Sequence, residues 1–75
     1  MDNYGVVLFN TTSAAMRSEK VLKKEKFDIK LIPTPRGLSS DCGVAMRFDW
    51  NYAEDVRTLL DAAGVEIEGI HQIQG

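Results

Sequence analysis

The sequence has a single cysteine, Cys42, and therefore cannot form a disulfide within the chain. A lone thiol is typical of proteins from reducing compartments. No apolar run approaches the ~20 residues needed to cross a bilayer, and the first residues lack the basic and apolar regions of a secretory signal. We therefore expect a cytoplasmic protein that does not bind a membrane.

An excess of charge of one sign is also lacking, because 9 basic residues face 11 acidic ones and the net charge is −2. Nucleic-acid-binding domains usually present a basic face, and the aromatic motif of RNA-recognition sheets is missing. One histidine, His71, and one cysteine cannot supply the four ligands of a zinc site. We expect no nucleic acid partner, no metal and no other cofactor.

What the chain does have is the composition of a small globular domain, with 44% hydrophobic and 27% charged residues. Its 75 residues make one domain, residues 1–75. A domain of this size has no room for a deep substrate cavity, so any site is expected on the surface, in a loop or at an interface.

Hydrophobic periodicity predicts four strands and two helices in the order β-α-β-β-α-β. The strands are expected at 4–10, 27–32, 44–50 and from 65 tailing off through 73, and the helices at 13–26 and 52–63. The polar residues 10–13 offer caps for the first helix, and Asn51 with Glu54 predicts a capping box for the second. Right-handed crossovers place both helices on one face of a four-stranded antiparallel sheet, the α+β ferredoxin-like fold.

The strand and helix patterns also predict which residues are buried. We expect a core of Val6, Leu8, Leu22, Ile29, Leu31, Val44, Met46, Val56, Leu59, Leu60 and Ile67. The face of the sheet without helices would receive Val7, Phe9 and Ile32, or the residues of opposite parity. Because an uncovered apolar face commonly meets another protein, we expect a homodimer or a permanent partner.

One connection, residues 33–41, is longer than the two-residue turn that could join its strands. Pro33, Pro35 and Gly37 exclude a helix or a central strand there. Cys42 stands at its exit, and Arg36 is its only basic residue. Such a loop is more typical of a presented site than of a simple connector.

The chemistry predicted for this loop is that of a thiolate. A free cysteine has a pKa of about 8.5, which a guanidinium or a set of backbone N–H groups lowers. Arg36 and the backbone of residues 39–43 could do so, whereas the Asp41 carboxylate would act in the opposite sense. We expect Arg36 and the backbone N–H groups to outweigh the Asp41 carboxylate, so that the pKa of Cys42 is lowered. We also expect the thiol of Cys42 to be solvent-reachable. The alternative is a small buried hydrophobe, because Cys42 shares the parity of Val44.

Residues 31–48, LIPTPRGLSSDCGVAMRF, resemble the hallmark of a small bacterial family, the putative selenium/sulfur carrier-like proteins. The resemblance extends over residues 4–73. Better-known small sulfur carriers differ, because their Cys-Pro-x-Pro motif opens a helix. The elements of the motif present here are Ile32, Pro33, Thr34, Pro35, Arg36, Ser39, Ser40, Cys42, Gly43 and Arg47.

The resemblance implies that Cys42 carries sulfur or selenium as a persulfide or selenosulfide, presented on the loop of residues 33–43. A donor enzyme, such as a cysteine desulfurase or a selenium-delivering protein, would load it, and an acceptor protein would receive the atom. The loop residues expected to bind the cargo or a partner are Thr34, Arg36, Ser39, Ser40 and Gly43.

A second function class stays open beside the carrier. In it the same loop grips a small anion or a protein without covalent chemistry. Both are favoured over an enzyme, because one thiol without an evident base or pocket makes an incomplete active site. The sequence does not distinguish sulfur from selenium and does not identify the donor or the acceptor.

Overall fold

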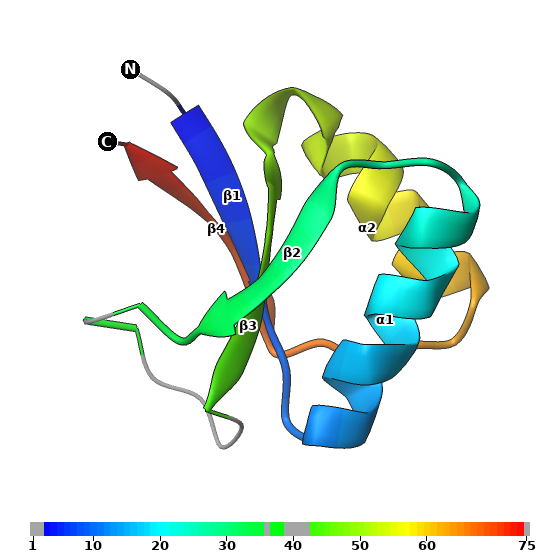
Figure 1. Ribbon diagram of the computed structural model, residues 1–75, viewed down its shortest axis with the longest axis horizontal. Helices are drawn as coiled ribbons and strands as arrows, with labels where there is room; N and C mark the ends of the chain where they lie inside the picture. Colours follow the sequence, from blue (N-terminus) through cyan, green and yellow to red (C-terminus); the bar gives the residue numbers. More distant parts are fainter. Residues whose placement is uncertain (1–2, 36, 39–42, 75) are drawn as a thin grey trace.

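The computed structural model describes residues 3–35, 37–38 and 43–74, and for Gln74 only the backbone. Its elements follow the predicted order (Figure 1). They are β1 (Asn3–Leu8), α1 (Thr12–Lys24), β2 (Ile29–Pro33), β3 (Val44–Asp49), the short 3-10 helix η1 (Trp50–Tyr52), α2 (Ala53–Ala62) and β4 (Gly69–Gln74).

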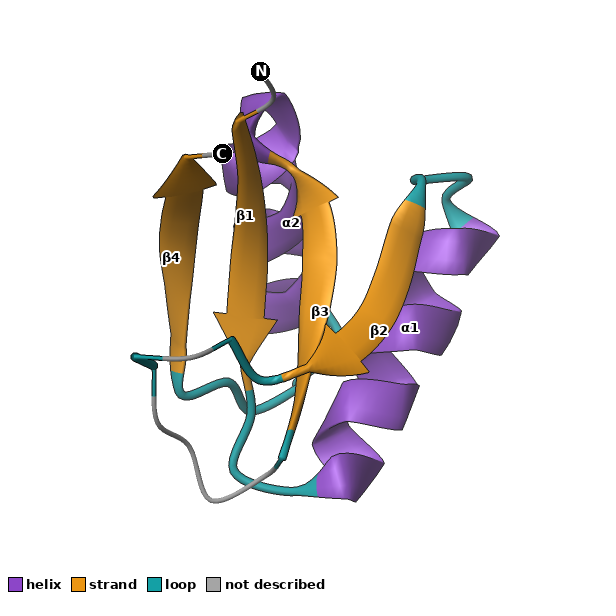
Figure 2. Ribbon diagram, turned by 60° about the vertical axis from the view of Figure 1, so that its left-hand side comes forward, coloured by secondary structure: helices purple, strands orange, loops and turns teal. Residues whose placement is uncertain are grey.

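The four strands form one sheet in the order β2-β3-β1-β4, and every neighbouring pair is antiparallel. Both helices lie on the same side of this sheet (Figure 2). The α+β ferredoxin-like fold is therefore confirmed, including the antiparallel pairing of β2 with β3. In the part of the chain that the structure describes, no helix combines the length and the apolar character needed to span a bilayer.

The first helix begins where the polar residues after β1 predict. The side chain of Thr11 accepts a hydrogen bond from the N–H of Ala14 at 3.1 Å, so Thr11 is the N-cap. At the other end, Lys23 and Lys24 occupy the last turn, where cations stabilise the negative end of the helix dipole. These local interactions explain why the observed helix differs from the predicted one only by a residue or two at its ends.

The predicted cap of the second helix was wrong. The side chain of Asp49, not Asn51, acts as the cap, and it accepts the N–H of Asn51 at 2.9 Å at the start of η1. The helix α2 then begins at Ala53 without a side-chain cap. The extra turn of η1 takes over the role that the capping box was expected to fill.

The predicted start of the fourth strand at residue 65 was also wrong. Residues 65–68 connect α2 to β4, which begins at Gly69. Val65 is nevertheless buried and packs in the helix-side core, and Ile67 packs against it. The alternation of these apolar residues with glutamates thus reflects a connection that runs along the core rather than a strand.

The main core lies between the sheet and the helices. It contains residues from both helices, from the strands β1–β3 and from the connections after β1 and α2, namely Val7, Phe9, Ala15, Leu22, Ile29, Met46, Phe48, Val56, Leu60 and Val65. Of the predicted core, seven residues are buried and four are half-buried: Leu31, Val44, Leu59 and Ile67.

The parity expected for β1 was wrong. Val7 and Phe9 face the helices and are fully buried, whereas Val6 and Leu8 point to the opposite face. There they form a second cluster with Ala45, against which Tyr4, Ile32, Leu38 and Ile73 pack. The face without helices thus has a small core of its own, whose three central residues are at most 3% exposed.

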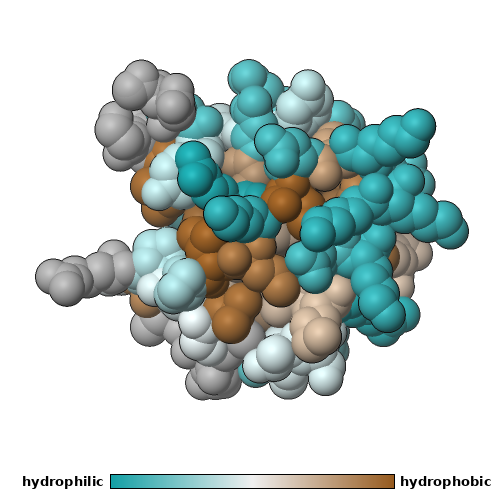
Figure 3. Space-filling view, in the orientation of Figure 1, coloured by the Kyte–Doolittle hydropathy of each residue, from teal (hydrophilic) through white to brown (hydrophobic). Residues whose placement is uncertain are grey.

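The outer surface separates polar and apolar regions. Figure 3 shows hydrophilic side chains over α1, whose Lys20, Lys23 and Lys24 are exposed, and an apolar strip beside them. Among the described residues, the exposed large apolar side chains are those of Met16 and Tyr52.

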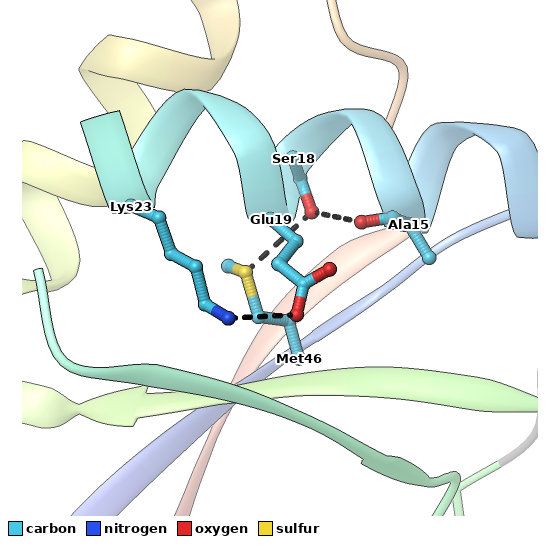
Figure 4. Close-up of polar contacts among 5 residues, drawn as sticks. All are labelled: Ala15, Ser18, Glu19, Lys23 and Met46. Atoms are coloured by element: carbon cyan, nitrogen blue, oxygen red, sulfur yellow. Dashed lines mark hydrogen bonds and ion pairs between the residues drawn. The ribbon is translucent and has the colours of Figure 1, made fainter. Parts of the chain in front are cut away.

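Ser18 allows α1 to pack closely on β3. It is fully buried, and its hydroxyl donates to the carbonyl of Ala15 at 2.8 Å and lies 3.5 Å from the sulfur of Met46 (Figure 4). On the outer side of the same helix, Lys23 and Glu19 form an ion pair at 3.3 Å. The polar atom inside the core is therefore satisfied within its own helix.

Candidate functional site

The candidate site lies in the connection between β2 and β3. Its described part leaves the end of β2 and runs along the face of the sheet opposite the helices (Figure 2). The residues on either side of this connection are Pro33 and Val44, which are directly paired in the β2–β3 ladder. The sheet therefore holds both ends of the loop close together.

The base of the loop is closed by one further hydrogen bond. The N–H of Thr34 donates to the carbonyl of Gly43 at 3.0 Å, one step beyond the Pro33–Val44 pair. Thr34 and Gly43 are two of the predicted binding residues, and the structure brings their backbones together. The residue that precedes Gly43 in the chain is Cys42, so this hydrogen bond holds the backbone next to the thiol-bearing residue.

A tight turn shapes the first half of the loop. The N–H of Leu38 donates to the carbonyl of Pro35 at 3.1 Å, and Gly37 has a φ of +92°. A positive φ at the third position of a four-residue turn is the requirement of type II, which favours glycine there. The side chain of Leu38 then packs against the cluster of Val6, Leu8 and Ala45. The loop is thus anchored to the open face of the sheet.

The other predicted site residues, Arg36, Ser39, Ser40 and Cys42, lie outside the described residues, as does Asp41. Both predictions for Cys42, the reactive thiol and the buried hydrophobe, therefore stay predictions. Gly43 is exposed, and a Cβ added to it would meet no atom within 4 Å. A close approach of another described residue is therefore not the reason for a glycine at this position.

Arg47, the last residue of the sequence motif, lies away from the loop. It is four residues along β3 from Gly43, or about 13 Å at the rise of a strand. Its guanidinium carbon lies 4.3 Å from the centre of the Tyr4 ring. Arg47 therefore stabilises the far end of the sheet by a cation–π contact.

Sequence reasoning missed an open cavity of about 550 Å³ at this far end of the sheet. Its lining includes Asn3, Tyr4, Asp28, Lys30, Arg47 and Asp49. The signal that could have found it is the pairing of β2 with β3, which sets Lys30 directly opposite Arg47. The loop and this cavity lie at opposite ends of β2 and are separate features.

The facing cations Lys30 and Arg47 give a direct test of the β2–β3 register. Like charges at directly opposed positions destabilise a sheet, and opposite charges stabilise it by about 0.2–1 kcal/mol. We expect Lys30→Glu to raise the free energy of unfolding by roughly this amount in urea denaturation. Lys20→Glu, at an exposed position of α1, is the matched control and should not raise it. A lower stability for Lys30→Glu would contradict the register.

A metal centre has no support in the described part of the chain, where no group of three His, Cys, Asp or Glu side chains could hold an ion. His71 lies exposed on β4, opposite Val6 of β1.

Comparison with known proteins gives one match. A family model described as "Putative Se/S carrier protein-like" matches residues 4–72, which is nearly the whole chain. No curated protein and no solved structure matches the sequence.

Proposed function

Because the chain belongs to the family described as "Putative Se/S carrier protein-like", we propose that it carries sulfur or selenium on the thiol of Cys42. The family match over residues 4–72 is the observation that carries this proposal. The closed base of the loop adds support, since the Thr34–Gly43 hydrogen bond holds the backbone beside Cys42. The donor is a cysteine desulfurase or a selenium-delivering protein, and the acceptor is a second protein.

The proposed step is an exchange between sulfur atoms. The Cys42 thiolate attacks the terminal sulfur of a persulfide on the donor, whose S–S bond breaks. The donor thiolate leaves with the bonding electron pair, and a new S–S bond joins the transferred sulfur to Cys42. An acceptor thiolate then attacks the terminal sulfur and releases the Cys42 thiolate. A donor selenosulfide reacts in the same way, with selenium as the transferred atom, so no further oxidant or reductant is required.

In this proposal the remaining loop residues bind the thiolate and its cargo or hold the loop in shape. Arg36 supplies a positive charge for the thiolate and for the persulfide anion that replaces it. Ser39 and Ser40 supply hydroxyl donors, and Thr34 and Gly43 hold the base of the loop closed. A loop outside the hydrogen-bonded ladder of the sheet suits a carrier, because its cargo must reach two different proteins in turn.

Loading is tested by intact-mass spectrometry after incubation with a cysteine desulfurase and free cysteine. The wild type is expected to gain the mass of one sulfur atom, which a thiol reductant removes. Cys42→Ser is expected to gain none, because it lacks the accepting thiol. Arg57→Ala, at an exposed position of α2 outside the loop, is the control, because it keeps the thiol and every loop residue.

The same experiment separates the carrier from the non-covalent binding module. In the binding module, the wild type gains no sulfur, and Cys42→Ser still binds its anion or protein partner. A wild type that stays unmodified by the desulfurase, supplied in turn with free cysteine and with free selenocysteine, contradicts the carrier function.

A further inference from the structure

The strand β2 is an edge of the sheet, with β3 on one side only. The hydrogen bond from Thr34 N–H to Gly43 shows that even-numbered positions of β2 bond to β3. Because backbone groups alternate along an antiparallel strand, the N–H and C=O groups of Ile29 and Leu31 point outward. Pro33 shares this parity, which places the residue without an N–H where no ladder partner is needed. The edge from Ile29 to Leu31 thus offers unpaired donors and acceptors.

The sequence around this edge is a chemical palindrome. Residues 27–31 read Phe-Asp-Ile-Lys-Leu, that is apolar, acidic, apolar, basic, apolar. If two such strands pair antiparallel about a two-fold axis at Ile29, Asp28 of each copy lies opposite Lys30 of the other. Directly opposed residues project to the same face of a sheet, so two ion pairs form together. On the other face, Phe27 of each copy lies opposite Leu31 of the other.

The surface at this edge is apolar enough to associate. Figure 3, in which β2 faces the viewer, shows an apolar strip across the centre of the molecule with hydrophilic side chains around it. Three apolar residues of this stretch, Phe27, Leu31 and Ile32, are only half-buried. A second copy would cover them further.

The charges of Asp28 and Lys30 at this edge also have no ion-pair partner among the described residues. Lys30 lies opposite the like charge of Arg47 on β3, and the ion pair recorded among the described residues joins Lys23 to Glu19. Asp28 of a second copy would give Lys30 an opposite charge on its open side. The pairing thus corrects a local repulsion that the isolated chain retains.

We propose that β2 is a homodimer interface, in which two copies pair antiparallel at Ile29 and join their sheets into one. The two Ile29 residues exchange a pair of backbone hydrogen bonds. The outward N–H of Leu31 donates to the carbonyl of Phe27 in the second copy, while the N–H of Phe27 keeps its bond to Leu22 at 3.1 Å. Because only about five residues of each copy pair, the interface is small, and we expect a dissociation constant on the order of 100 µM.

Charge reversal tests both the interface and its register by sedimentation or diffusion measurements at several hundred micromolar protein. Asp28→Lys alone and Lys30→Asp alone each create two like-charge pairs across the axis, so each should weaken self-association about tenfold or more. The double variant Asp28→Lys with Lys30→Asp restores both ion pairs and should dimerise like the wild type.

Mixing the two single variants gives the sharpest result. Asp28→Lys offers two lysines at the edge and Lys30→Asp offers two aspartates, so an equimolar mixture should form a heterodimer although each variant alone self-associates more weakly than the wild type. Asp61→Lys and Arg57→Glu, both exposed on α2, are the charge-matched controls and should dimerise normally. Circular dichroism confirms that each variant is folded.

Two outcomes would overturn the proposal. One is a wild type that stays monomeric throughout this concentration range. The other is a dimer that the single reversals leave intact, which would place the interface elsewhere, for instance on the open face of the sheet. This test does not involve Cys42, so its result is independent of the carrier function.

Discussion

Gly5→Ala is expected to lower the free energy of unfolding by about 1–3 kcal/mol, the usual cost of overpacking a core. A Cβ at position 5 would overlap Cζ of Phe48 and lie 2.7 Å from Cε3 of Trp50, closer than any ordinary contact. The two rings are stacked with their centres 6.1 Å apart, and Phe48 is only 3% exposed. They cannot move aside without disturbing the core. Urea denaturation of the purified variant gives the measurement.

Two companion variants make the test of Gly5 specific. Gly43→Ala should change stability by less than about 0.5 kcal/mol, because an added Cβ meets no atom within 4 Å there. Gly5→Ala combined with Phe48→Leu should lose less than the sum of the two single changes, since the shorter side chain leaves room for the methyl group. A Gly5→Ala protein as stable as the wild type would show that the rings pack differently from the structure.

The second large effect is expected on the reactivity of Cys42. In the proposed carrier, the guanidinium of Arg36 stabilises the thiolate, which is the form that attacks sulfur or iodoacetamide. Removing the charge with Arg36→Ala should therefore slow alkylation near neutral pH by about tenfold, which corresponds to roughly 1.4 kcal/mol of lost preference for the anion. The rate is measured by iodoacetamide labelling from pH 6 to 10. This range of about two units on each side of pH 8 covers the titration of a thiol.

Charge and position are then separated by two controls. Arg36→Lys keeps the positive charge and should retain most of the rate, whereas Arg57→Ala removes a charge from α2 and should leave the rate unchanged. If the wild type labels only when it is unfolded, Cys42 is a structural residue, and the carrier function loses its chemical basis.

Much of the fold follows from local patterns. The alternation of apolar and polar residues in β2 and β3, and the apolar stripes of α1 and α2, predict elements that the structure confirms within a few residues. The polar residues 10–13 could be read as caps, and Thr11 is the one that caps, because its short side chain reaches the N–H of Ala14 without tertiary help. The prediction of Asn51 as the cap failed because the extra turn of η1 is not visible in the helical periodicity.

The candidate site, like the fold, could be predicted from the sequence only in part. Two prolines, a glycine and the lone cysteine mark the β2–β3 connection as unusual, and the family match agrees with the family that the sequence resembles. The contacts that anchor the loop could not be predicted, because they join residues distant in sequence. Leu38 packs on Val6 and Leu8 of β1, about thirty positions away, and no periodicity records such a contact.

The sequence by itself determined the order of the elements, the antiparallel ferredoxin-like topology and the place of the long loop, because these depend on periodicity, on turn residues and on the handedness of crossovers. Only the tertiary structure decided which face of β1 meets the helices. Both faces of that strand are apolar, so alternation along it carries no information. The choice depends on the register with β3 and β4, which sends Val7 and Phe9 into the helix-side core and leaves Val6 and Leu8 to hold the loop that leads to Cys42.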